Sequence, residues 1–245
     1  MKAMIFAAGL GTRLKPLTDS VPKALVQING KPLLEWLLIK MAQEGIRDVV
    51  VNVHHFAGQV KDFLNTQPVP DLNILISDET DRLLDTGGGL KYAASLLSGS
   101  EPVLIHNTDI LSSISFSALE QVFTASQADA LLLVKDRKTS RKLEFSSDGK
   151  LTGWINESTG ETIAADASFG NGHRMAYSGI AVVGAGFPAS LPMDGAFGLI
   201  PACLQLTATK KIVEYTCDYD WLDVGKPDAL EPAGRMIEKF YTPLL

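Results

Sequence analysis

The sequence predicts an α/β fold, a three-layer sandwich in which helices cover a mixed, mostly parallel sheet. Three observations lead to this fold class. Short apolar runs alternate with segments of helical spacing through the first half of the 245 residues. The run at residues 2–7 is apolar almost throughout, as a strand buried on both faces would be. The second half is richer in strand-like segments, which predicts a small inserted β-rich region laid against the sheet.

In the first half, strands and helices are expected in turn. Strands are predicted at residues 2–7, 48–53, 73–77 and 102–106, and helices at residues 32–44, 56–65 and 88–97. Pro32 suits the first turn of its helix, and Gly45 suits the C-terminal stop. Strands separated by helices imply right-handed crossovers between parallel neighbours.

The second half changes character after residue 110. Asp148 and Gly149 form a plausible hairpin turn between two of its strands. No repeat, low-complexity tract or linker interrupts the chain, so we expect a single domain over residues 1–245. Strands are predicted at residues 130–135, 143–146, 151–156, 176–183 and 211–217, and helices at residues 198–209 and 228–240.

Composition excludes several classes of function. The net charge of −6 argues against general affinity for nucleic acid or for an anionic membrane. No stretch approaches the roughly 18 apolar residues of a membrane span, and the N-terminus lacks the pattern of a signal peptide. We therefore expect a cytoplasmic protein. Cys203 and Cys217 have no metal-ligand spacing, which favours reduced structural thiols.

A glycine-rich loop, Gly9-Leu10-Gly11-Thr12-Arg13-Leu14, directly follows the first strand. Open α/β sheets bind ligands at the carboxyl ends of their strands, and glycines let backbone N–H groups approach phosphate oxygens. Arg13 and Lys23 add positive charge. Leu14 stands where a dinucleotide fingerprint needs glycine, and the P-loop pattern is absent. Taken alone, the loop is a weak signal, and a tight turn without a ligand is the alternative.

A longer string, which runs from this loop to Pro32, resembles the signature of the sugar-1-phosphate nucleotidyltransferases. It reads Gly9-x-Gly11-Thr12-Arg13-Leu14-x-Pro16-Leu17-Thr18, then Pro22-Lys23-x-Leu25, then Gly30-Lys31-Pro32. Four further segments follow in family order, so that the resemblance covers roughly residues 1–230: Asp85–Gly89, Asn107-Thr108-Asp109, Tyr177-Ser178-Gly179 and Trp221–Gly225. The short length, the Thr-Gly-Gly-Gly loop and the Trp-x-Asp-Val-Gly ending look closest to the N-acetylmuramate-1-phosphate uridylyltransferases of cell-wall recycling. Small mannose-1-phosphate guanylyltransferase-like proteins are the next nearest.

The resemblance implies a Rossmann-like (GT-A-like) sheet and an enzyme that transfers a nucleoside monophosphate from an NTP to a sugar 1-phosphate. UTP with N-acetylmuramate 1-phosphate is the favoured substrate pair. Guanylyl transfer to mannose 1-phosphate and nucleotidyl transfer to glucose 1-phosphate are the alternatives. Residues 1–110 would form the nucleotide-binding half and residues 111–230 the sugar-binding half, closed by the helix at residues 228–240. A monomer or a small homo-oligomer is expected.

The reaction joins two anions, so catalysis requires alignment and charge neutralisation, with no protein nucleophile. Mg²⁺ prefers hard oxygen ligands and takes one or two carboxylates. Asp109 and Asp223 each follow a strand-like segment, and the resemblance makes them the expected Mg²⁺ ligands. It also implies Arg13, Lys23 and Asp109 as catalytic residues. The implied nucleotide-binding residues are Ala8, Gly9, Gly11, Thr12, Arg13, Lys23, Gly87 and Gly88, and the implied sugar-binding residues are Asn107 and Gly179.

Several positions leave alternatives open. Glycines 87–89 weaken a helix start, which close approach of the nucleoside or a flexible loop would explain. Thr108 departs from the glycine that many members carry before the metal-binding aspartate. Lys142 is a weak candidate for a second catalytic lysine and fits the surface better. Phe197 lies either near the sugar or against the core, and the His54–His55 pair fits loop structure better than a metal site.

Two other classes of function remain to be weighed against the transferase. A glycosyltransferase has a related sheet and an aspartate-containing metal motif, but it needs no clamp of Arg13 and Lys23 on a triphosphate. A non-catalytic nucleotide-sensing homologue would retain the fold. Loss of Lys23 or of either aspartate would favour it, and all three residues are present.

Overall fold

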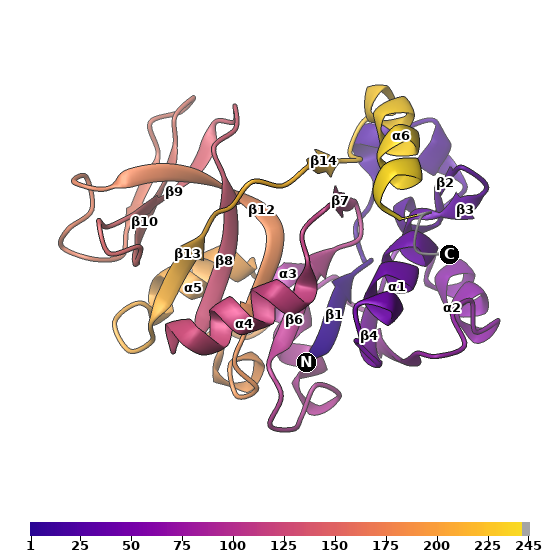
Figure 1. Ribbon diagram of the computed structural model, residues 1–245, viewed down its shortest axis with the longest axis horizontal. Helices are drawn as coiled ribbons and strands as arrows, with labels where there is room; N and C mark the ends of the chain where they lie inside the picture. The colour runs from indigo at the N-terminus through magenta and orange to yellow at the C-terminus, as the bar shows by residue number, and fades with distance from the viewer. Residues whose placement is uncertain (242–245) are drawn as a thin grey trace. The chain divides into compact units, whose positions relative to one another are not determined.

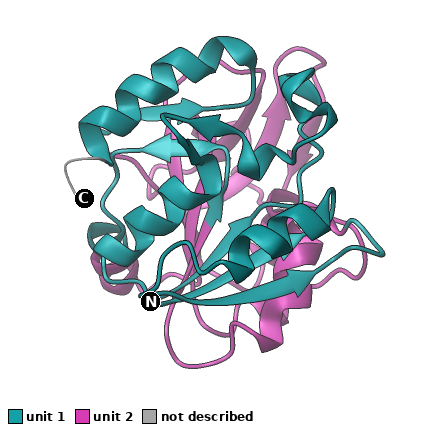
Figure 2. Cartoon of the chain, turned by 90° about the vertical axis from the view of Figure 1, so that its right-hand side faces the viewer, with its two compact units in different colours: residues 1–83, 106–119, 219–245 teal, residues 84–105, 120–218 magenta. Residues whose placement is uncertain are grey.

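The computed structural model describes residues 1–241, which group into two compact units. Unit 1 contains Met1–Leu83, His106–Leu119 and the chain from Tyr219 onward, and unit 2 contains Leu84–Ile105 and Glu120–Asp218. Figure 2 shows unit 1 in teal and unit 2 in magenta. The prediction of a single domain over residues 1–245, with two functional halves, stays a prediction, and its residues 242–245 lie outside the described part.

Unit 1 is built around parallel strands that are buried as their sequences predict. β1 (Lys2–Phe6) pairs with β4 (Asp48–Val53), and β4 pairs with β5 (Asn73–Asp78), both in parallel register. The crossovers contain α1 (Leu33–Gln43) and α2 (Ala57–Asn65) (Figure 1). These strands and helices agree with the predicted ones to within one residue at each end.

The C-terminal helix and α1 share one hydrophobic core in unit 1. α6 (Leu230–Phe240) contributes Ala233, Met236 and Ile237 to a cluster that also contains Leu33 and Trp36 of α1. The Trp36 indole N–H donates to the Ile28 carbonyl at 2.8 Å. That bond fixes α1 against the short hairpin of β2 (Gln27–Ile28) and β3 (Lys31–Pro32). Burial of these side chains holds the segments before and after the parallel strands in place.

A second small ribbon in unit 1 was not predicted from the sequence. β7 (Ile110–Ser112) pairs antiparallel with β14 (Trp221–Asp223), with Asp223 opposite Ile110. Each strand has only three residues, too few for an alternating pattern to be recognised. This ribbon brings residue 110 and residue 223 side by side.

Unit 2 has a mixed sheet in which β8 (Ala130–Lys135) lies between two neighbours. β8 pairs parallel with β13 (Ile212–Tyr215) and antiparallel with β12 (His173–Val183). The predicted β-rich insertion is an antiparallel meander, in which β12 pairs with β9 (Arg141–Phe145), β9 with β10 (Leu151–Asn156), and β10 with β11 (Thr162–Ala164). Gly149, at the β9–β10 turn, has a φ of +78°, which favours glycine.

The helices of unit 2 are α3 (Asp85–Tyr92) and α5 (Leu199–Leu206). α3 begins three residues before the predicted helix, so the glycines at 87–89 lie inside it. Two elements cross the unit boundary: β6 (Val103–Asn107) and α4 (Phe116–Ser126). The prediction missed α4, although its buried Phe116, Leu119 and Phe123 have helical spacing. None of the described helices is long and apolar enough to cross a membrane.

Candidate active site

The glycine loop leaves β1 and is folded back on itself by contacts within unit 1. Gly11 has a φ of +65°, and a Cβ there would lie 3.0 Å from Thr18 Cγ2 and 3.2 Å from Lys23 Cβ. The Thr18 hydroxyl donates to the Gly11 carbonyl at 2.8 Å. Leu14 is fully buried and anchors the far end of the loop. Glycine is therefore required at position 11 by conformation and by space.

Gly9 differs from Gly11, because a Cβ built on Gly9 meets no atom within 4 Å. Packing therefore gives no reason for glycine at this position. Ala8 beside it is buried, whereas Thr12, in the turn that follows, is exposed. An open, exposed backbone at the carboxyl end of a parallel strand is the place where a phosphate can approach N–H groups.

Two buried polar residues that sequence analysis missed hold the start of this loop. Asn52 of β4 accepts a hydrogen bond from the Ala7 N–H at 2.8 Å and donates one to Glu79 Oε1 at 2.8 Å. Asn52 and Glu79 are 2% and 3% exposed. The signal was present, since Asn52 is the one polar residue among the valines that fill the rest of the strand after Asp48. The network ties the ends of β1, β4 and β5 together beneath the loop.

The expected cationic residues each face one of the two expected carboxylates. Lys23 forms an ion pair with Asp109, and the two side chains are 14% and 20% exposed. Arg13 Nη1 lies 3.6 Å from Asp223 Oδ2, and the Arg13 side chain is 57% exposed. Solvent screens the Arg13 pair, so Arg13 is free to turn toward a ligand at little cost.

Asp109 and Asp223 are brought together by the ribbon of β7 and β14. The Val224 N–H donates to the Asp109 carbonyl at 2.8 Å, beside the pairing of Asp223 with Ile110. The prediction placed Asp223 just past the strand at residues 211–217, at the edge of the main sheet. In the structure that strand is β13 of unit 2, and Asp223 ends a separate strand of unit 1. The aspartates converge because β14 pairs with the segment that follows Asp109.

The surroundings of Asp223 fit a hard cation. Burial, and then the neighbouring Asp109 carboxylate, raise the pKa of Asp223 in spite of Lys23 and Arg13. Its Oδ1 atom is buried without a hydrogen-bond partner in the described part of the chain. A Cβ on Gly225 would lie 2.6 Å from this Oδ1 and 2.8 Å from Arg13 Nη2. Two adjacent carboxylates with a bare buried oxygen form the donor set that Mg²⁺ takes from proteins.

No group of three or more His, Cys, Asp or Glu side chains suited to a metal occurs within residues 1–241. A pair of carboxylates is therefore the strongest candidate metal site in unit 1. His54 does not join it, because its Nδ1 lies 2.7 Å from the Glu79 carbonyl. This contact agrees with the expected structural role of the His54–His55 loop.

In unit 2, the glycines of α3 have a packing reason that the sequence did not reveal. A Cβ on Gly87 would lie 2.5 Å from the Phe197 ring, and one on Gly88 would lie 2.2 Å from the Gly195 carbonyl oxygen. The N–H groups of Gly87 and Gly88 both donate to the Phe197 carbonyl, at 2.8 and 3.0 Å. Phe197 is buried, so it packs on the core. The nucleotide contact expected of these glycines stays a prediction.

The residues expected on the sugar side have distinct local settings. Asn107 ends β6 in unit 1. Thr108 turns its hydroxyl onto the Phe6 carbonyl at 2.6 Å, so its side chain is committed to β1. Gly179 of unit 2 has a φ of +81° and lies in an irregular part of β12, where the register with β8 shifts between Tyr177 and Ala181. Irregularities of this kind often occur beside functional sites.

The remaining candidates are Lys142 and the two cysteines. Lys142 Nζ lies 3.6 Å from Glu157 Oε2, and its side chain is 21% exposed, so its expected surface role stays a prediction. Cys203 and Cys217 are both free thiols. Burial raises the pKa of Cys203 to about 12, so this thiol stays protonated and unreactive.

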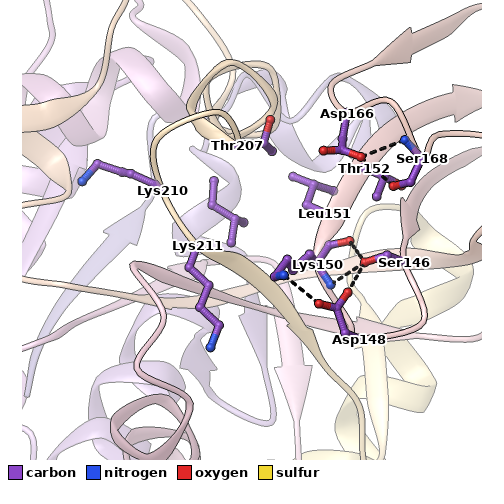
Figure 3. A pocket seen from close by; sticks show the side chains of 11 residues that line it. Ser146, Asp148, Lys150, Leu151, Thr152, Asp166, Ser168, Thr207, Lys210 and Lys211 are labelled. Atoms are coloured by element: carbon purple, nitrogen blue, oxygen red, sulfur yellow. Dashed lines mark hydrogen bonds and ion pairs between the residues drawn. The ribbon is translucent and has the colours of Figure 1, made fainter.

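A pocket of about 310 Å³ lies entirely within unit 2 and contains none of the predicted site residues. Figure 3 shows Lys150 paired with Asp148, and Asp166 bonded to Ser168. Lys210 and Lys211 have their partners outside the lining, since Lys210 pairs with Asp129 and Lys211 donates to the Ser126 carbonyl. The pocket is lined by Ser146, Asp148, Lys150, Leu151, Thr152, Asp166, Ser168, Thr207, Lys210, Lys211 and Ile212.

Comparison with known proteins identifies clear relatives. The family model described as nucleotidyl transferase matches residues 2–145. The N-acetylmuramate alpha-1-phosphate uridylyltransferase of Caulobacter vibrioides is 33% identical over 243 residues, covering 96% of this chain and 97% of the relative. The protein of the same name from Neisseria meningitidis is 42% identical over 121 residues, covering 49% of this chain and 52% of the relative.

Solved structures show the same fold. The UDP-glucose pyrophosphorylase of Acinetobacter baumannii superposes with a TM-score of 0.76 at 18% identity, covering 100% of this chain and 99% of the other. At this identity the likeness concerns the fold alone. It confirms the predicted α/β class with a mixed, mostly parallel central sheet.

Proposed function

Because the chain belongs to the nucleotidyl transferase family, we propose that it transfers the uridylyl group of UTP to N-acetylmuramate 1-phosphate, releasing pyrophosphate. The membership confirms the resemblance drawn from the sequence and the enzyme class, a sugar-phosphate nucleotidyltransferase that forms a nucleotide sugar. The choice of substrates is carried by one observation. The Caulobacter protein that bears this activity in its name is similar over nearly the whole length of both chains.

Asp109 and Asp223 are the residues that would hold a divalent cation, for which we propose Mg²⁺. The bound ion would neutralise phosphate charge and align the α-phosphorus with the attacking oxygen. The support from unit 1 is the adjacency of the two carboxylates and the buried Oδ1 of Asp223, which has no hydrogen-bond partner among residues 1–241.

Lys23 and Arg13 would supply the positive charge that the triphosphate requires. Lys23 is held close to Asp109 and has three N–H donors, so it can bind a phosphate oxygen while it keeps its carboxylate partner. Arg13 is more exposed and only loosely paired with Asp223, so its planar fork can turn onto two phosphate oxygens. The N–H groups near Gly9 and Gly11 would add neutral donors. Positioning of this kind requires no protein nucleophile.

The nucleoside and the sugar would be held by the remaining predicted residues. Ala8, Gly9, Gly11 and Thr12 belong to the loop after β1. Gly87 and Gly88 would offer only van der Waals surface to the nucleoside, because both N–H groups already donate to Phe197. Asn107 and Gly179 would contact the sugar. We further propose that the protein acts in the cytoplasm, as a monomer or a small homo-oligomer.

A matrix of four NTPs against four sugar 1-phosphates tests the substrate pair, with pyrophosphate release as the measurement. The sugars are N-acetylmuramate, N-acetylglucosamine, mannose and glucose. We expect the highest kcat/KM for UTP with N-acetylmuramate 1-phosphate. Turnover only with GTP and mannose 1-phosphate would refute this pair. Nucleotide binding without turnover in every combination would support the non-catalytic homologue instead.

The Asp109→Asn variant tests the metal assignment in the same assay. It should lose Mg²⁺-dependent pyrophosphate release while remaining folded, because the substitution removes a charge but little volume. Asp148→Asn, on the exposed β9–β10 turn of unit 2, is the matched control and should retain full activity. Activity retained by Asp109→Asn would contradict the assignment of Asp109 to the metal.

A further inference from the structure

The ribbon that carries the two aspartates uses only one edge of β7 for pairing with β14. The Val224 N–H donates to the Asp109 carbonyl at 2.8 Å, and the Ser113 N–H donates to the Asp220 carbonyl at 3.0 Å. Residues 109 and 113 therefore direct their backbone groups toward β14. In an antiparallel pair, every second residue directs its backbone groups to the opposite side. Ser112 thus points its N–H and its carbonyl away from β14.

The hydroxyl of Tyr241 occupies the place of a strand on this second edge. The Ser112 N–H donates to Tyr241 Oη at 3.0 Å, and the Tyr241 hydroxyl donates to the Ser112 carbonyl at 3.2 Å. Both residues are fully buried. A buried backbone N–H and carbonyl need partners, and a single phenol oxygen here serves both.

The phenol ring is itself fixed by groups from α1 and from the start of α4. Lys40 Nζ lies 5.6 Å from the centre of the Tyr241 ring and 4.9 Å from that of Phe116. It is also paired with Glu44 at 2.7 Å. The other Glu44 oxygen accepts the Phe116 N–H. The tyrosine is therefore held by a buried charged pair on one side and by β7 on the other.

We propose that Tyr241 is a positioning residue for the Asp109–Asp223 pair. Its hydroxyl fixes the outer edge of β7, and β7 fixes where β14 places Asp223 relative to Asp109. Tyr241 touches Ser112, two residues along β7 from the Asp223–Ile110 pairing, and not the carboxylates. The inference rests on the proposed function in that the pair is taken to hold a divalent cation.

The Tyr241→Phe variant removes one oxygen and keeps the ring against Lys40. Titration with Mn²⁺ alone, followed by the electron paramagnetic resonance signal of free Mn²⁺, measures metal affinity without any substrate. We expect the Mn²⁺ Kd to rise at least fivefold. The Mg²⁺ concentration for half-maximal pyrophosphate release should rise by a similar factor, with the KM for the sugar phosphate within twofold of the wild type.

Phe240→Leu is the matched control, because Phe240 is the preceding residue and packs against the same core without any hydrogen bond between its side chain and β7. It should lower the thermal midpoint and leave the Mn²⁺ Kd within twofold of the wild type. The Mn²⁺ titrations are run at a temperature below the thermal midpoint of the least stable variant. An unchanged Mn²⁺ Kd in Tyr241→Phe, or an equal rise in Phe240→Leu, would overturn the proposal.

A failure of the proposed transferase function can be told apart from a failure of the role proposed for Tyr241. A wild-type protein that releases no pyrophosphate with any substrate pair refutes that function, while the Mn²⁺ titration still decides the role of Tyr241. A rise in Kd for Tyr241→Phe alone supports the positioning role in either case.

Discussion

The buried Asn52 beneath the glycine loop gives a quantitative prediction. Asn52→Leu replaces the side chain amide with an apolar group of similar length. The Ala7 N–H loses its acceptor, and the Glu79 carboxyl loses the donor that now lies 2.8 Å away. Both losses occur in a buried site, where water cannot replace the missing partner.

The size of the effect follows from the two hydrogen bonds. An unsatisfied buried N–H costs about 2 kcal/mol, and a lost bond to a carboxylate costs about 2 kcal/mol more. Burial of the leucine side chain returns roughly 1 kcal/mol. The free energy of unfolding should therefore fall by about 3 kcal/mol, which for a chain of this size lowers the thermal midpoint by about 6–12 °C.

Urea unfolding and calorimetric titration with UTP measure the two consequences. Because Asn52 holds Ala7 at the start of the loop, we also expect the Kd for UTP to rise at least fivefold. Asn73→Leu on the neighbouring β5 is the control, since its amide donates to Asp48 at the exposed surface. The control should change stability by less than about 0.5 kcal/mol. A loss below about 1 kcal/mol in Asn52→Leu, with unchanged UTP binding, would refute the reasoning.

Three further predictions concern single positions. Gly88→Ala should lower the thermal midpoint, because its Cβ would lie 2.2 Å from a backbone oxygen. Gly9→Ala, where a Cβ meets no atom, should keep the wild-type midpoint and weaken UTP binding. Equal midpoints for the two variants in scanning calorimetry would contradict the packing of α3. Lys23→Met should reduce kcat by about 10²–10³-fold. Lys150→Met is the control, because Lys150 is exposed and its loss should leave full activity. A loss of kcat below tenfold in Lys23→Met would argue against a role for Lys23. Burial lowers the pKa of His106 from 6.5 to about 4. The stability that neutral His106 contributes is therefore complete above pH 6.5 and lost as the pH falls toward 4, by roughly 3 kcal/mol. His106→Phe should remove that part of the pH dependence in urea unfolding, and an unchanged slope would contradict it.

Much of the fold could be predicted because its signals are local. The apolar runs of β1, β4 and β8 and the helical spacing of α1 identify those elements directly. The short strands β7 and β14 could not be predicted, because three residues carry too little pattern. The start of α3 was placed three residues late because glycines 87–89 are poor helix formers. For Gly87 and Gly88 the reason is tertiary, since a Cβ would clash with Phe197 at position 87 and with the Gly195 carbonyl at position 88.

The candidate site was partly predictable in the same sense. Arg13, Lys23, Asp109 and Asp223 were singled out from the motifs, and the structure places them in two ion pairs within unit 1. Asn52 and Glu79 were missed because a single asparagine in β4 and a single glutamate directly after β5 form no motif. Their roles appear only when β4 and β5 lie side by side.

The sequence by itself determined most of the longer strands and helices, the family and the residue types available for phosphate and metal. These properties depend on neighbouring residues and on short spacings along the chain. The tertiary structure alone decided how Asp223 reaches Asp109 and why Tyr241 matters to both. Those contacts join positions more than 100 residues apart, Ser112 and Tyr241 by 129 residues. Such contacts depend on the packing of α6 against α1 and on the edge of β7 that β14 leaves open, and neither leaves a local pattern in the sequence.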